Sequence, residues 1–243
     1  MMTQRSLRFE QLEGRLLLAG NVKVAVSRGD LIVTGDQPGG ADFNDTIEIA
    51  FLDPAYRVTG SNGTQLVYNG QLGATFDVPG VTRDVIVDMK TGTDIVSIRM
   101  GPGDTRFNVP RNLTIKGGVG VDTVVVENAD VTGAMTLDGG LENNTLQVRQ
   151  TTVKKDVSIK TGTGDNNAVL LEQVTLNGKL TVTTGNGSDL GVTLKGGSVA
   201  KDVTVKTGNG DRTKVLFDQV TVTADKLFVS TGNGNDQDVS LLI

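Results

Sequence analysis

The chain has 243 residues, with 23 Lys and Arg against 28 Asp and Glu for a net charge of −5, and it contains no His, Cys or Trp. Without His and Cys there is no Ser-His-Asp or Cys-His nucleophile, no His or Cys metal site and no disulfide, so catalysis would need carboxylates, Lys, Arg, Tyr or a hydroxyl. The acidic balance and the few aromatic residues argue against a nucleic-acid partner, and no apolar run approaches the roughly 20 residues of a membrane-spanning helix.

Residues 1–20 stand apart from the rest of the chain. Their one uninterrupted apolar run, Leu16–Ala19, is shorter than the roughly 7 to 15 residues of a secretory signal peptide. Phe9, Leu12 and Leu16 follow the i, i+3, i+7 spacing of an amphipathic helix. Such a helix would cap the first coil of a β-sheet protein and protect its open edge.

The same segment resembles the LEPR-xLL type of N-terminal motif that bacterial surface proteins carry. The matching residues are Leu12, Glu13, Arg15, Leu17 and Leu18. Gly14 stands where that family usually has Pro. The resemblance implies an exported protein with an extracellular or cell-surface location. A targeting motif and a helical cap are compatible interpretations of residues 1–20.

A looser strand pattern follows this segment. Asp30–Gly35 and Asn44–Ile49 each alternate apolar residues with others, as short strands do. They follow each other in the same order as the paired strands that recur further along the chain. We therefore predict that residues 21–84 form irregular coils of the same repeating structure.

From residue 85 onward the chain repeats a unit that is 22 to 24 residues long in its regular part. Each unit opens with an alternating first strand and a Gly turn, and the regular first strands start at Leu113, Met135, Val157, Leu180, Val203 and Leu227. A second alternating strand begins 11 or 12 residues later, at Val124, Leu146, Val169, Val192, Val215 and Val239. A third apolar position follows seven residues after that, at Val131, Val153, Leu176, Val199 and Val222.

The segment that begins at Val85 follows the same pattern, but the next unit starts 28 residues later. If Val109 is its third apolar position, the additional residues form an insertion rich in Gly and Pro near Gly101. The insertion then lies in a loop and leaves the strand pattern on both sides unchanged.

Short alternating strands that are bounded by Gly, Asn and Asp turns and repeat at a fixed period predict one β-helix coil per unit. We therefore predict an all-β fold: a right-handed, single-stranded parallel β-helix of about nine coils, which spans residues 21–243 as one domain and is regular over 85–243. Like positions of successive coils would stack about 4.8 Å apart. Their inward side chains would form ladders of Val, Leu and Ile.

The turn between the first and second strands carries the most regular polar motif, at Thr161–Asp165, Thr184–Asp189, Thr207–Asp211 and Thr231–Asp236. It resembles the Gly- and Asp-rich nonapeptide of haemolysin-type calcium-binding proteins, which implies calcium as a ligand. The residues that would bind calcium, together with loop carbonyls, are Asp165, Asp189, Asp211 and Asp236. The motif departs from that family because it occurs once per coil and has Thr in place of the first Gly.

The alternative interpretation is that these motifs are only tight turns. Gly permits positive φ and a close backbone approach, and Asn tolerates the left-handed region. Asn186, Asn209 and Asn233 would then stack as an amide ladder. This alternative needs no metal, and the sequence predicts no cofactor other than calcium.

Charged residues also recur at fixed places in the unit. Pairs precede the first strands at Arg83–Asp84, Lys155–Asp156, Lys201–Asp202 and Asp225–Lys226. Three Lys residues lie three positions into first strands, at Lys116, Lys160 and Lys206. A positive row would suit an anionic surface polysaccharide, whereas charges of mixed sign would form a solvated face that discourages sideways strand pairing.

An enzymatic alternative comes from analogy of fold, because many right-handed β-helix proteins are polysaccharide lyases or hydrolases. The polar and aromatic residues of the irregular regions are Asp36, Asp42, Asp45, Tyr56, Tyr68, Asp104 and Arg106. They show no catalytic spacing, so we name no catalytic residue.

We interpret the chain as a non-enzymatic structural or adhesive module of a bacterial cell-surface or extracellular protein. A calcium-stabilised repeat protein and a carbohydrate-active β-helix are the alternatives. Leu241–Ile243 lies at the end of a second strand, with no polar cap after it. We expect this open coil to be covered by a second copy or by continuation into a longer polypeptide, because open coils expose unpaired backbone groups.

Overall fold

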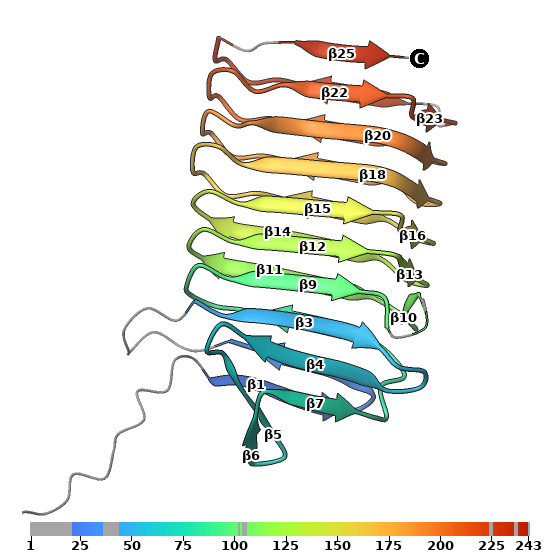
Figure 1. Cartoon of the computed structure of the whole chain (residues 1–243). Coiled ribbons are helices and arrows are strands. Elements are labelled where there is room, and N and C mark those ends of the chain that lie inside the picture. The colour runs from blue at the N-terminus through green and yellow to red at the C-terminus, as the bar shows by residue number, and fades with distance from the viewer. Residues whose placement is uncertain are drawn as a thin grey trace, which may run out of the picture.

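The computed structural model describes residues 21–35, 44–101, 103, 106–223, 226–235 and 238–242. These residues form strands and turns, with no helix among them. All of the described strands belong to two long sheets that run side by side along the molecule (Figure 1). The predicted all-β fold is therefore confirmed, whereas the helical cap and the motif predicted for residues 1–20 lie outside the described residues.

The first strands of successive coils stack in parallel in the 11-stranded sheet. They are β2 (Asp30–Thr34), β8 (Val85–Asp88), β11 (Leu113–Val119), β14 (Met135–Leu141), β17 (Val157–Lys160), β19 (Leu180–Thr183), β21 (Val203–Lys206) and β24 (Leu227–Ser230). Each residue pairs with the like residue of the next coil, so the repeat period of the sequence is also the register of the sheet.

The second strands stack in the same way in the 14-stranded sheet. They are β3 (Thr46–Phe51), β9 (Ile95–Arg99), β12 (Thr123–Glu127), β15 (Thr145–Arg149), β18 (Ala168–Leu176), β20 (Gly191–Val199), β22 (Val215–Asp218) and β25 (Val239–Leu242). The third positions are β10 (Phe107–Val109), β13 (Ala129–Val131), β16 (Thr152–Val153) and β23 (Thr221–Val222), together with the last residues of β18 and β20. Val109 pairs with Val131, which confirms the position of the insertion near Gly101.

The solenoid has six complete three-strand turns in its described part, from β8 to β23, with incomplete turns of β2 and β3 below and β24 and β25 above (Figure 1). The prediction of about nine coils was therefore too high. The difference arises before residue 85, where most of the chain does not wind into coils.

Most of residues 21–84 form antiparallel strands, and not the irregular coils that we predicted for this segment. Only β2 and β3 stack in parallel on the next turn. The remaining strands are β1 (Asn21–Ser27), β4 (Tyr56–Ser61), β5 (Gln65–Tyr68), β6 (Gln71–Gly73) and β7 (Thr75–Val78), and four of their pairings are antiparallel. Two hairpins have two-residue loops with positive φ at both positions, Arg28–Gly29 and Asn69–Gly70, as type I′ turns require.

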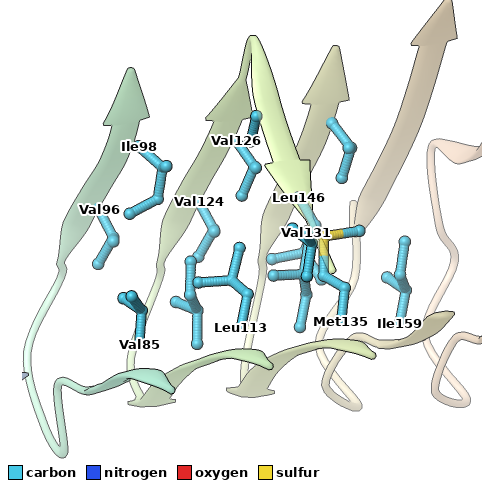
Figure 2. Close-up of a cluster of buried hydrophobic side chains, with 14 of the residues drawn as sticks. Val85, Val96, Ile98, Leu113, Val124, Val126, Val131, Met135, Leu146 and Ile159 are labelled. Carbon is cyan, nitrogen blue, oxygen red and sulfur yellow. The ribbon is translucent and has the colours of Figure 1, made fainter. Parts of the chain in front are cut away.

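The core is a column of aliphatic side chains between the sheets, and Figure 2 shows Val85, Leu113 and Met135 pointing across it toward Val96, Val124 and Leu146. Along one ladder the stacked residues are Val85, Leu113, Met135, Val157, Leu180 and Val203, each at most 1% exposed. The predicted inward ladders are confirmed. They allow a chain that is only 37% hydrophobic to bury a continuous core.

Antiparallel strands close the N-terminal end of this column. Val58 on β4 and Val78 on β7 are fully buried. The buried Tyr56 ring packs with Phe51 at 5.1 Å and with Phe107 at 5.4 Å between ring centroids. The Tyr56 hydroxyl donates to the carbonyl of Asn108, so the cap is tied to the first complete turn.

Candidate functional site

The turns between first and second strands are stacked one above another. The backbone N–H of Asn209 donates to Oδ1 of Asn186 at 3.2 Å, and the N–H of Asn233 donates to Oδ1 of Asn209 at 3.0 Å. The expected ladder is present, but each Asn oxygen binds a backbone amide of the following coil and not another side-chain amide. We call this column, with the turn residues beside it, the exposed ladder.

Glycine is required in these turns because the coils approach very closely. A Cβ on Gly208 would lie 1.8 Å from the carbonyl oxygen of Gly185, and one on Gly210 would lie 1.9 Å from that of Gly187. Both contacts are with backbone, which cannot rotate away. The repeated Gly residues therefore follow from coil stacking itself.

The aspartates that the sequence suggested as calcium ligands lie in different places. Asp165 accepts the N–H of Ser188 at 2.8 Å, and Asp211 accepts the N–H of Asn235 at 2.7 Å, both in the exposed ladder. Asp189 is only 2% exposed and points into the molecule. Asp236 lies outside the described residues. Among the residues that the structure describes, no three His, Cys, Asp or Glu side chains gather as a metal site would require.

A second polar column lies at the start of the second strands, and the sequence analysis did not recognise it. Its members are Asp45, Asp94, Asp122, Asn144, Asn167 and Asp189, each at most 2% exposed. We call this column the buried ladder. From Asp94 onward the spacings are 28, 22, 23 and 22 residues, so a search for Asp or Asn before each second strand would have found it.

From Asp94 onward, Oδ1 of each residue in the buried ladder accepts the backbone N–H of the corresponding residue in the preceding coil. The distances are 2.7 Å from Asp45 to Asp94, 2.9 Å from Asp94 to Asp122, 2.9 Å from Asp122 to Asn144, 2.7 Å from Asn144 to Asn167 and 3.2 Å from Asn167 to Asp189. These bonds satisfy buried amides at the turn, which are costly to leave unpaired. Side chains of the buried ladder therefore bind the backbone of the preceding coil, whereas side chains of the exposed ladder bind the backbone of the following coil.

Burial perturbs three acids of the buried ladder. Loss of solvation raises the pKa of Asp94 from 3.8 to about 8, opposed by the N–H of Asp45. It raises the pKa of Asp122 from 3.8 to about 6, opposed by the N–H of Asp94. Burial also raises the pKa of Asp189, although hydrogen bonds from Thr184 and Asn167 counteract the shift.

The outer faces carry charges that alternate in sign from coil to coil. On the 14-stranded sheet the column is Arg99, Glu127, Arg149, Glu172, Lys195 and Asp218. On the other sheet, Lys116 lies between Asp88 and Asp138. The row of Lys residues that suggested a polysaccharide site is thus interrupted by Asp138 and Thr183, and the polysaccharide partner stays a prediction.

The charged residues that precede the first strands join neighbouring coils. Asp84 accepts the N–H of Asn112 at 3.0 Å and pairs with Arg111. Asp156 accepts the N–H of Lys179 at 2.9 Å, and Lys179 in turn lies 3.8 Å from Asp202. Exposed pairs of this kind contribute little to stability, but they favour the correct register between coils. Asp225 lies outside the described residues.

The residues suggested for a carbohydrate-active site do not come together where the structure describes them. Asp45 belongs to the buried ladder, and Tyr56 belongs to the N-terminal cap. Tyr68 packs against Phe76, and Arg106 pairs with Asp130 at 2.7 Å. Asp36, Asp42 and Asp104 lie outside the described residues. A shallow hollow of about 310 Å³ beside Leu190 is lined by uncharged residues of β15, β18 and β20 and their flanks.

The architecture and the ladders define the class of protein: a repetitive parallel β-solenoid whose polar turn residues join one coil to the next. No protein-family model, curated protein or solved structure matches the chain. The described residues contain no helix of the length and apolarity needed to cross a membrane.

Proposed function

We propose that the chain is a non-enzymatic structural or adhesive β-solenoid module of a bacterial cell-surface or extracellular protein. The observation that supports a structural role is the use of its polar side chains, because the Asp and Asn columns bind the backbone of neighbouring coils. The surface location rests on the LEPR-xLL resemblance of residues 1–20. Protease treatment of intact cells tests it, since a protein inside the cell would survive.

The C-terminal end of the solenoid offers a surface for association. Val239 and Leu241 are 53% and 54% exposed, whereas Val215 and Phe217, which occupy the same positions one coil earlier, are at most 1% exposed. The exposed side chains therefore continue the inner ladders without a covering layer among the described residues. We propose that a further layer of strands covers this end, supplied by a second copy or by a continuing polypeptide.

Leu241→Lys is expected to prevent self-association of the chain. The substitution places a charge on the inner ladder at the exposed end, where an incoming layer would have to bury it. Light scattering at micromolar concentration measures the effect. Ser240→Lys is the matched control, because Ser240 lies on the same strand but pairs with Leu216 on the outward face. A parent chain that is monomeric, and unchanged by Leu241→Lys, would exclude a second copy as the covering layer.

A calcium-stabilised solenoid is the second candidate, because Asp165 and Asp211 present exposed carboxylates in the same column. On this candidate, millimolar calcium raises the melting temperature of the parent chain, and Asp211→Asn removes much of that rise. Asp77→Asn serves as a control, because Asp77 pairs with Arg57 away from these turns. Calorimetry that detects no heat of calcium binding, with no shift in melting, would eliminate the candidate.

A further inference from the structure

The buried ladder contains two kinds of residue that are placed alike but differ in hydrogen bonding. Nδ2 of Asn144 donates to the carbonyls of Leu141 and Glu142, at 3.1 and 3.2 Å. Nδ2 of Asn167 likewise donates to the carbonyl of Gly162 at 3.2 Å and to that of Gly164. In both coils the side-chain amide fills a small polar site that is formed by carbonyl oxygens of the preceding turn.

In the coil of Asp122, a second carboxyl oxygen stands in the place of that amide nitrogen. A Cβ on Gly139 would lie 3.0 Å from Nδ2 of Asn144, and a Cβ on Gly117 would lie 2.4 Å from Oδ2 of Asp122. Gly117 and Gly139 occupy like positions of paired strands. Oδ2 of Asp122 therefore lies over the same backbone position as Nδ2 of Asn144.

The Oδ2 atoms of Asp94 and Asp122 have no hydrogen-bond donor. Asp94 and Asp122 are each 1% exposed, and Oδ2 of each has no hydrogen-bond partner. A carboxylate facing the turn carbonyls would set acceptor against acceptor, in a site where water does not compensate. An ionised carboxyl without a donor is among the most costly groups to bury.

The electrostatic interactions of the two carboxyls are with other acids. Asp94 interacts with Asp122 in the next coil and with Asp45 in the preceding one. Asp122 interacts with Glu142 in the turn of the next coil. These interactions all favour the neutral form of the two carboxyls.

We propose that Asp94 and Asp122 fold as protonated carboxylic acids, each donating its proton to a carbonyl of the turn that precedes it, so that the first complete turns of the solenoid lose stability as rising pH removes the two protons. Protonation turns Oδ2–H into a donor, which is what the amide nitrogen of Asn provides in the later coils. A rise in pH removes the proton and leaves a buried charge against the carbonyls.

The pKa values agree with this geometry and define the pH windows. Both groups bind the proton more tightly in the folded chain than in the unfolded chain, where the pKa is near 3.8. The stability that these two protons contribute is therefore full below about pH 4 and is lost as pH rises, up to about pH 6 for Asp122 and up to about pH 8 for Asp94. Within its window, each group raises the unfolding equilibrium constant by up to about tenfold per pH unit.

Asp94→Asn and Asp122→Asn test the proposal, because Asn is the native residue of the same ladder in the next coils and fits the site. The measurement is denaturant unfolding from pH 4 to pH 9 in a buffer with EDTA, which excludes metal ions. We expect the parent chain to lose stability between pH 6 and pH 8, with at least about a tenfold rise in the unfolding constant. Asp94→Asn should remove that loss, and Asp122→Asn should flatten the profile mainly below pH 6.

Asp165→Asn is the matched control, since Asp165 also accepts a backbone N–H from the neighbouring coil but lies in the exposed ladder. It should leave the difference between pH 6 and pH 8 unchanged. The proposal is overturned if the parent is as stable at pH 8 as at pH 6, or if the two Asn variants keep the parent's profile. It is also overturned if, at pH 8 in a buffer without EDTA, calcium stabilises the parent but not the two Asn variants, since a bound cation would then occupy the site.

Discussion

Replacing Val205 by Asp is expected to unfold the coils around it. Val205 is fully buried in the middle of β21, between Val182 of the coil below and Val229 of the coil above. The side chains stacked on it in the neighbouring coils are aliphatic and offer no donor to a carboxylate. We expect a loss of about 4 kcal/mol or more, a large part of the roughly 5 to 15 kcal/mol that stabilises a typical protein. Circular dichroism and thermal melting measure the loss.

Two variants on the same strand control this result. Val205→Ile keeps the site apolar and is expected to cost about 1 kcal/mol or less, because one added methylene is partly accommodated by neighbouring side chains. Thr204→Asp places the same charge one residue away, on the outward face, and should cost about 1 kcal/mol at most. If Val205→Asp melts like Thr204→Asp, the assignment of inward and outward faces is incorrect.

Gly140→Ala is expected to be nearly as damaging, although it adds only one methyl group. Gly140 has φ +89°, and a Cβ there would lie 1.8 Å from the carbonyl oxygen of Gly118 in the coil below. Positive φ alone costs an alanine about 1 to 2 kcal/mol. The contact then has to push two hydrogen-bonded coils apart, so we expect a total loss of about 3 kcal/mol or more in denaturant unfolding.

Gly80→Ala separates the two causes. Gly80 has a similar φ of +82°, but a Cβ there would meet no atom within 4 Å. It should therefore show the cost of the backbone conformation without the contact. Equal losses for the two variants would mean that the coils separate easily, and that close stacking is not the reason for glycine in these turns.

Much of the fold could be predicted because each strand residue pairs with the residue at the same position of the next repeat, so that the spacing of the repeats in the sequence also gives the register of the sheets. The insertion near Gly101 could be located from the spacing of apolar residues alone, since the third position at Val109 remains in register with Val131. The hairpins before residue 85 were missed for the opposite reason. Asn69–Gly70 is a strong local signal for a type I′ turn, which the prediction of irregular coils over residues 21–84 did not take into account.

The buried ladder was missed because its residues have ordinary turn composition. Asp94 and Asp122 follow Gly-containing turns, where Asp is usually exposed. Their burial depends on the backbone of the neighbouring coils, which the local sequence does not describe. The calcium ligands were chosen from the motif alone, and that choice combined residues of the exposed ladder with Asp189 of the buried one.

The opposite directions of the two ladders affect how such a protein can change in length. The units that begin at Val157 and Leu180 each bring one side-chain oxygen for the coil after them and another for the coil before them. A tandem duplication of either whole unit therefore provides the new ladder amides with acceptors and the new acceptors with amides. A duplication of part of a unit would disrupt both columns at once. Inherited changes in length should accordingly come in whole coils, with each one extending the molecule by about 4.8 Å.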